Sequence, residues 1–120
     1  MSRLGLHRGD VVIVDFLPTK PNAFIRPALV VQNDRDNART VNTIVVQITR
    51  NLTRAHEDTH LLIDSGHPDW QNSGLATASA VNCSTLAYVD QQDVLRIIGQ
   101  LSAATMQRVD SCLKAALGLP

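Results

Sequence analysis

Six short apolar segments, separated by polar and turn-forming residues, limit the folds open to this chain. The segments are rich in β-branched residues, which favour strands. They lie at residues 11–16, 28–32, 40–49, 59–63, 78–89 and 95–99. We expect a polar turn at 33–39, a long loop at 64–74, and a polar turn or one short helical turn at 90–93. Because strands and helices do not alternate, the pattern predicts antiparallel strands that close into a small barrel.

The C-terminal segment changes from the two-residue period of a strand to the 3.6-residue period of a helix. Ser102 can cap a helix through its hydroxyl, and Gly118 and Pro120 can end it. One apolar stripe is expected, formed by Met106, Val109, Leu113 and Leu117, with Cys112 and Ala116 beside them. The fold class predicted is mainly β (α+β), a small antiparallel barrel with a C-terminal α-helix, in a single domain of residues 1–120.

Composition narrows the function classes. The 120 residues include 11 basic and 11 acidic ones, and charged residues make up only 18%. This excludes a disordered charged tail protein and removes strong overall positive charge as an argument for nucleic-acid binding. No apolar run approaches the roughly 20 residues that span a bilayer, and the N-terminus does not resemble a signal peptide. A cytoplasmic protein without membrane attachment is therefore expected.

Metal and cofactor sites are not indicated. The four histidines and two cysteines lack the spacing of a metal site, and there is no phosphate-binding glycine loop. Cys83 and Cys112 are interpreted as buried small hydrophobes, with a redox or nucleophilic role as the alternative. We predict no metal and no cofactor.

Basic residues are concentrated in one part of the chain. Residues 17–56 hold six basic and two acidic side chains, a net charge of +4. Such a stretch can form a local positive surface that contacts phosphates. It can equally be a set of solvated loop residues, and both interpretations stay open.

Arg26, Thr49 and Arg50 are candidates for a phosphate site at strand ends. Arg26 precedes Pro27, which restricts its backbone to extended conformations, and a guanidinium suits bidentate phosphate binding. Thr49 ends the long strand predicted at 40–49, and Arg50 follows it. A structural ion pair for Arg26 and ordinary strand propensity for Thr49 are the alternatives.

Several blocks in this order resemble one known family. They are Arg8-Gly9-Asp10-Val11-Val12, Leu17-Pro18, Arg26-Pro27-Ala28-Leu29-Val30-Val31-Gln32-Asn33-Asp34, Ile48-Thr49, Thr59-His60 and Gly99-Gln100-Leu101-Ser102, followed by Met106, Val109-Asp110 and Ala115-Ala116-Leu117-Gly118-Leu119. The family is that of the MazF/PemK/Kid toxins of bacterial toxin–antitoxin modules. The resemblance implies an SH3-like barrel, a homodimer and inhibition by a cognate antitoxin protein. It also implies a metal-independent endoribonuclease that cleaves single-stranded RNA at short sequence motifs.

The resemblance also implies roles for individual residues. The ribose 2′-hydroxyl would attack the adjacent phosphorus and leave a 2′,3′-cyclic phosphate. The catalytic residues would be Arg26, which stabilises charge on the phosphoryl oxygens, and Thr49, which hydrogen-bonds one of them. We expect further RNA contacts from Lys20, Asn22, Phe24, Gln47, Arg50, Arg54, Ser79 and Thr85.

The chain departs from the family pattern in two places. The loop at 19–25, expected to be mobile and to take part in RNA selection, is about two residues shorter and has no acid. The strand at 84–90 keeps only its closing Asp90 among the family's usual polar residues. No carboxylate is an obvious general base, and Ser79 and Thr85 are weak substitutes. The alternative is therefore a noncatalytic binder on the same barrel, either a gyrase-poison-like protein or an RNA-binding homologue.

Overall fold

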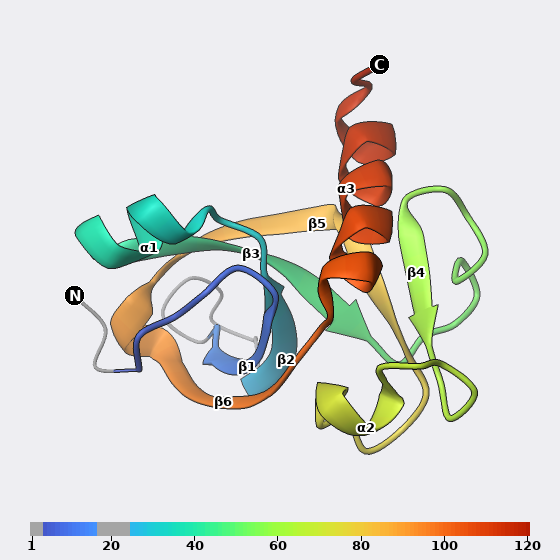
Figure 1. Cartoon of the computed structure of the whole chain (residues 1–120), viewed down its shortest axis with the longest axis horizontal. Coiled ribbons are helices and arrows are strands. Elements are labelled where there is room, and N and C mark those ends of the chain that lie inside the picture. Colours follow the sequence, from blue (N-terminus) through green and yellow to red (C-terminus); the bar gives the residue numbers. More distant parts are fainter. Residues whose placement is uncertain (1–3, 17–24) are drawn as a thin grey trace.

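The computed structural model describes residues 4–16 and 25–120 (Figure 1). Its elements are β1 (Asp10–Asp15), β2 (Ile25–Val30), α1 (Asp34–Arg39), β3 (Asn42–Thr49), β4 (His60–Ile63), α2 (Trp70–Ser73), β5 (Ser79–Asp90), the 3₁₀ turn η1 (Gln91–Asp93), β6 (Val94–Gln100) and α3 (Ala103–Leu117). The predicted loop at 19–25 lies outside the described residues except for Ile25. No helix within the described ranges is long and apolar enough to cross a membrane.

All six strands belong to one antiparallel sheet in the order β4-β5-β3-β2-β1-β6. The sheet curls strongly, and α3 stands against it beside β4 and β5 (Figure 1). The predicted fold class, mainly β with a C-terminal helix, is confirmed.

The central strands are buried on both faces, which explains their nearly continuous apolar sequence. On β1, Val11 packs in the cluster that lies under α3, whereas Val12 and Val14 pack inside the curl of the sheet. Leu29 and Val30 on β2 divide between the two clusters in the same way. Each face therefore has its own core.

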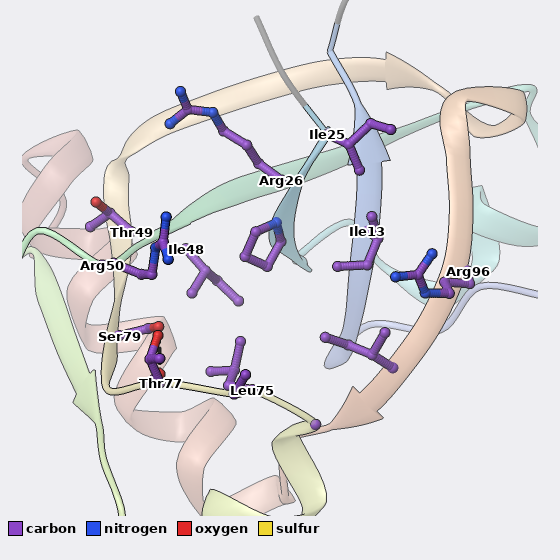
Figure 2. Close-up of a pocket in the computed structure, with 14 residues that line it drawn as sticks. Ile13, Ile25, Arg26, Ile48, Thr49, Arg50, Leu75, Thr77, Ser79 and Arg96 are labelled. Atoms are coloured by element: carbon purple, nitrogen blue, oxygen red, sulfur yellow. Dashed lines mark hydrogen bonds between the residues drawn. The ribbon is translucent and has the colours of Figure 1, made fainter.

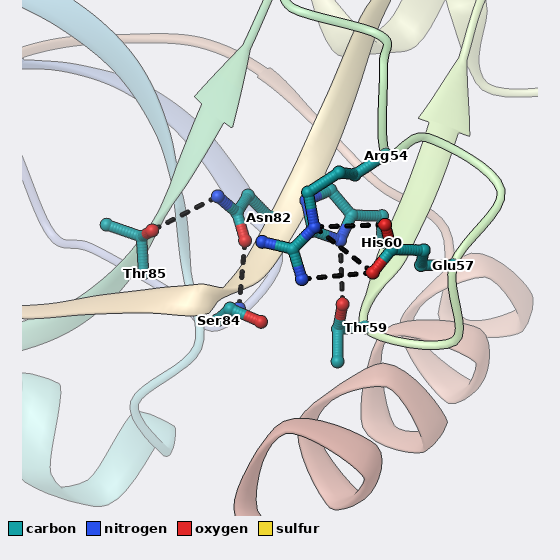
Figure 3. Close-up of polar contacts among 7 residues, drawn as sticks. All are labelled: Arg54, Glu57, Thr59, His60, Asn82, Ser84 and Thr85. Atoms are coloured by element: carbon teal, nitrogen blue, oxygen red, sulfur yellow. Dashed lines mark hydrogen bonds and ion pairs between the residues drawn. The ribbon is translucent and has the colours of Figure 1, made fainter.

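A bulge interrupts β5 where it crosses β3. Val46 pairs with Leu86, but the next residue, Gln47, pairs with Asn82. The extra residues 83–85 bend the strand. The Asn82 side chain holds the bulge, because its Nδ2 donates to Thr85 Oγ1 at 3.1 Å and its Oδ1 accepts from the Ser84 N–H at 3.0 Å (Figure 3).

Both cysteines are buried in the core under α3, as the sequence predicts. Burial raises the pKa of the Cys83 thiol to about 12, and it also raises the pKa of Cys112. Thiols protonated in this way are poor nucleophiles. This favours the structural interpretation over a redox or nucleophilic role.

Residues 34–39 form helix α1, so the prediction of a polar turn at 33–39 was wrong. Asn33 caps the helix, since its Oδ1 accepts from the Asp36 N–H at 2.8 Å. Asp34 and Asp36 lie in the first turn and Arg39 in the last, which suits the helix dipole. The prediction of a loop at 64–74 was also incomplete, because α2 lies within it.

Strand β2 begins and ends earlier than predicted. Ile25, Arg26 and Pro27 already pair with β1, opposite Asp15, Val14 and Ile13. The pairing with β3 starts only at Ala28. Pro27 has no N–H to donate, which accounts for a strand that is paired on one side at this point.

Helix α3 begins and ends where the sequence predicts. The Ser102 Oγ accepts from the Thr105 N–H at 3.3 Å, and Gly118 ends the helix in the left-handed conformation. The buried side chains are Thr105, Met106, Val109 and Cys112. Leu113 is only half-buried, and Leu117 is 56% exposed. Of the predicted stripe, Leu117 does not pack against the sheet of its own chain, since the last helical turn extends beyond the sheet (Figure 1).

We expect Leu113→Ala to lower the free energy of unfolding by about 1 to 2 kcal/mol, below the range of fully buried leucines. The reason is that part of the Leu113 side chain already contacts water. Leu117→Ala, on the exposed last turn, is the control and should change stability by less than about 0.5 kcal/mol. Urea denaturation measures both values. Equal losses in the two variants would contradict the observed burial.

Candidate active site

A groove of about 620 Å³ opens where the end of β3 meets the start of β2 and the segment before β5 (Figure 2). Its described lining is Ile13, Ile25, Arg26, Pro27, Ile48, Thr49, Arg50, Gly74, Leu75, Ala76, Thr77, Ser79, Arg96 and Ile98. Four residues predicted from sequence, Arg26, Thr49, Arg50 and Ser79, are therefore brought together here.

The polar lining residues come from three chain segments. Arg26 is exposed at the start of β2, and Thr49 and Arg50 lie at the end of β3. Figure 2 shows these three toward one end of the groove, with Ser79 and Thr77 near them. Local strand structure thus places a guanidinium and a hydroxyl at neighbouring strand ends, as expected from the sequence.

The hydroxyl of Thr49 is oriented by the backbone that follows it. The Asn51 N–H donates to Thr49 Oγ1 at 3.1 Å. A hydroxyl that accepts one hydrogen bond still has its own proton to donate. Thr49 can therefore donate to an oxygen of a bound group. The Ser79 hydroxyl, in contrast, donates to the Thr77 carbonyl oxygen at 2.9 Å.

Charge in the groove has one sign. Among its described lining residues there are three arginines, Arg26, Arg50 and Arg96, and no acid. Arg50 and Arg96 have no side-chain hydrogen bond or ion pair to the described residues. Guanidinium groups arranged in this way suit an anionic ligand with several oxygens, such as a phosphodiester.

The groove wall at 74–79 is held by close backbone contact between α2 and β6. A Cβ on Gly74 would lie 2.0 Å from the Ile98 carbonyl oxygen, and one on Gly99 would lie 2.2 Å from the Asn72 oxygen. Asp69, directly before α2, accepts from the Ser102 N–H at 2.7 Å. Burial opposes ionisation of Asp69, but hydrogen bonds from Ser102 and Thr105 outweigh it and lower the pKa. These contacts fix the wall relative to β6.

Comparison with known proteins places the chain in a family. Residues 7–117 match the model of the PemK-like, MazF-like toxins of type II toxin–antitoxin systems. The chain belongs to this family. It is 31% identical over 114 residues to "Endoribonuclease EndoA" of Bacillus subtilis strain 168, covering 93% of this chain and 94% of that protein. The endoribonuclease class that the sequence motifs imply is therefore confirmed for this toxin.

Solved structures share the fold of the toxin. An "Endoribonuclease in complex with its cognate antitoxin from Mycobacterial species" superposes with a TM-score of 0.75 at 23% identity, over 96% of this chain and 97% of that one. MazF from Deinococcus radiodurans gives a TM-score of 0.73 at 17% identity, over 95% and 97% of the two chains. At these identities the likeness concerns the fold.

Three other residues predicted to contact RNA do not line the groove of the toxin. Gln47 is half-buried in the sheet between Ala28 and Asn82. Arg54 is exposed beyond β3 and bonds Glu57, with its Nη2 3.0 Å from Oε1 (Figure 3). Thr85 is part of the β5 bulge. The predicted contacts Lys20, Asn22 and Phe24 lie outside the described residues.

Sequence reasoning missed two polar residues of the groove, Thr77 and Arg96. Arg96 stands between Leu95 and Ile97 in an apolar segment, so its residue type is the only local signal. Arg96 reaches the groove because β6 pairs with β1, although about 80 residues of sequence separate the two strands. That pairing is not visible in the local pattern.

A second groove of about 550 Å³ lies between α3 and the chain around β4, and includes His56, His60 and Arg108. His60 is buried, and burial lowers its pKa, so that it is neutral at neutral pH. Across the described residues, no group of three or more His, Cys, Asp or Glu side chains could hold a metal ion.

Proposed function

We propose that this toxin cleaves single-stranded messenger RNA at short sequence motifs, in the cytoplasm and without a metal ion, and thereby inhibits growth. The observation that carries the proposal is the joining of Arg26, Thr49 and Arg50 in one groove without an acid among its described lining residues. Family membership supports the endoribonuclease class. The substrate, the mechanism and the residue roles are the parts proposed.

The proposed reaction is an internal transfer within the RNA. The ribose 2′-oxygen forms a bond to the adjacent phosphorus, and the bond from phosphorus to the 5′-oxygen of the next nucleotide breaks. The 2′-hydroxyl loses a proton and the leaving 5′-oxygen gains one. The products are a 2′,3′-cyclic phosphate and a 5′-hydroxyl end.

Arg26 and Thr49 act on the phosphoryl oxygens, where negative charge develops. Arg26 stabilises this charge as a permanent cation and does not act as an acid, because a guanidinium does not release its proton. Thr49 donates its hydroxyl proton, since its oxygen already accepts from Asn51. Arg50, at the same end of the groove (Figure 2), adds positive charge.

Proton transfer has no strong acceptor among the described lining residues. These residues include no Asp, Glu or His, and the Ser79 hydroxyl already donates to a carbonyl oxygen. Charge stabilisation and orientation of the RNA must then supply most of the acceleration. This favours a modest rate that rises with pH as the 2′-hydroxyl ionises.

The direct test is incubation of the purified protein with a long single-stranded RNA in the presence of EDTA. We expect cleavage at a restricted set of sites, with cyclic phosphate and 5′-hydroxyl ends. RNA binding without any cut would instead support the noncatalytic RNA-binding homologue. Failure to bind RNA at all would refute the proposed substrate.

Thr49→Ala is expected to reduce kcat for RNA cleavage about tenfold, the effect of losing one neutral hydrogen bond. Thr49→Ser keeps the hydroxyl and should retain most of the rate. Single-turnover cleavage of one oligonucleotide measures both variants. A Thr49→Ala variant as fast as the parent would remove Thr49 from the site.

The proposed partners are a second copy of this chain and a cognate antitoxin protein. Exposed apolar side chains on the edge strand β6, Leu95 at 44% and Ile97 at 38%, are consistent with pairing between copies. Sedimentation should give twice the 13.1 kDa of the chain. A monomer at micromolar concentration would contradict the homodimer.

A further inference from the structure

Arg96 lies at the opposite end of the groove from Thr49 and Arg50 (Figure 2). Its backbone pairs with Ile13 of β1, and Ile13 in turn pairs with Pro27 of β2. Directly paired residues of neighbouring strands face the same side of a sheet. Arg96, Ile13 and Pro27 therefore form a row across three strands, and all three line the groove.

The position of Arg96 separates it from the phosphate assigned to Arg26 and Thr49. In the sheet order, β2 and β1 stand between β3, which carries Thr49, and β6. Three strand spacings amount to about 14 Å along the sheet, and the straight path across its curl is shorter. The two ends of the groove are thus far enough apart to hold different phosphates of one RNA strand.

Apolar side chains form the floor between the two ends. Ile13, Pro27, Leu75 and Ile98 line the groove there, and each is half-buried. Apolar side chains that stay partly exposed in a groove offer a surface for the flat face of a base. The groove volume of about 620 Å³ is in the range of pockets that hold a whole organic ligand and is larger than a phosphate group needs.

Among the described residues, no fold-stabilising contact accounts for the Arg96 guanidinium. It has no hydrogen bond or ion pair to the part of the chain that the structure describes, whereas Arg8 and Arg54 each bond a carboxylate. No acid of the described groove lining competes for it. A charge on an edge strand can also serve only to prevent strand pairing between molecules, and the test below separates that role from RNA binding.

We propose that Arg96 binds a second phosphate of the RNA, next to the cleaved linkage, and that the apolar floor receives a base between the two phosphates. This inference rests on the proposed function and adds a binding determinant to it. Arg96 acts in RNA binding and positioning, while Arg26 and Thr49 act at the reacting phosphate. Its loss should therefore weaken affinity and raise KM more than it lowers kcat.

The test uses an oligonucleotide that spans a site cut by the parent protein, with a 2′-deoxy sugar at that site to prevent cleavage. Neutral methylphosphonates replace the phosphates one at a time. In the parent, a methylphosphonate at one position beside the scissile phosphate should lower the affinity for RNA about tenfold, the effect of losing a charged contact. In Arg96→Ala that position should lose its effect, and affinity for the unmodified RNA should fall about tenfold at low salt.

Salt dependence and two variants complete the test. In Arg96→Ala, the slope of log affinity against log salt should shrink by about 0.7, the value for one phosphate of a single strand. Arg96→Lys should restore part of the affinity, and Arg35→Ala, which removes an equal charge from exposed α1, should match the parent.

The outcomes distinguish the two proposals. If the parent cuts RNA and Arg96→Ala keeps both its affinity and the methylphosphonate pattern, Arg96 is only an edge-strand charge and this inference is wrong. A loss of affinity equal in Arg35→Ala would also overturn it, because net charge would then be the cause. If the parent neither binds nor cuts RNA, the proposed function itself fails.

Discussion

Arg26→Ala is expected to reduce RNA cleavage by on the order of 10² to 10³, the effect of removing one donor that stabilises transition-state charge. Arg26 is the second residue of β2 and reaches the end of the groove where Thr49 and Arg50 also lie. The loss should appear mainly in kcat, since the charge on the phosphoryl oxygens grows during the reaction. Single-turnover cleavage of a defined oligonucleotide measures it.

Two control variants accompany Arg26→Ala. Arg26→Lys keeps the charge but loses the planar fork of the guanidinium, so an intermediate rate is expected. Arg35→Ala removes an exposed charge from α1 and should cleave at the parent rate. Thermal unfolding confirms that each variant is folded. Cleavage by folded Arg26→Ala at the parent rate would show that the site is misassigned.

Gly99→Ala should lower the free energy of unfolding by about 3 kcal/mol, at the upper end of the usual cost of an added methyl group in a packed site. The new Cβ would lie 2.2 Å from the Asn72 oxygen and 2.4 Å from the Ser73 carbonyl carbon. Both contacts are to backbone, which cannot rotate away as a side chain can. The α2 segment would have to move from β6, and the groove wall that follows α2 would move with it.

Gly118→Ala provides the matched control. Gly118 has a φ of +69° but nothing within 4 Å of an added Cβ, so only the conformational cost of about 1 kcal/mol remains. Urea denaturation compares the two variants, and cleavage should fall only in Gly99→Ala. A Gly99→Ala protein as stable as Gly118→Ala would contradict the close approach of α2 and β6.

Local sequence patterns were sufficient for most of the secondary structure. β-branched runs identified the strands, because such side chains fit a pleated, half-buried surface. Helical spacing together with Ser102 and Gly118 identified α3 and its ends. Helix α1 was missed although Asn33 and the acids after it are a helix-start signal, since the segment has no apolar stripe to bury. Leu117 has the helical spacing of the buried positions but is exposed, because the sheet ends before the last helical turn.

Residue type and order in the chain pointed to the family, to Arg26 and to Thr49, since a cation and a hydroxyl at strand ends are chemically suited to a phosphate wherever the fold places them. Only the tertiary structure decided which residues share one groove. The pairing of β6 with β1 placed Arg96 in the groove. Gln47 lies within the sheet, Arg54 in the loop after β3 and Thr85 in the β5 bulge, so these three lie outside the groove. The placement of a polar residue depends on how its strand pairs with strands that are distant in the sequence. That pairing is determined by the burial of the apolar face of the whole strand, and not by the polar residue that the strand carries.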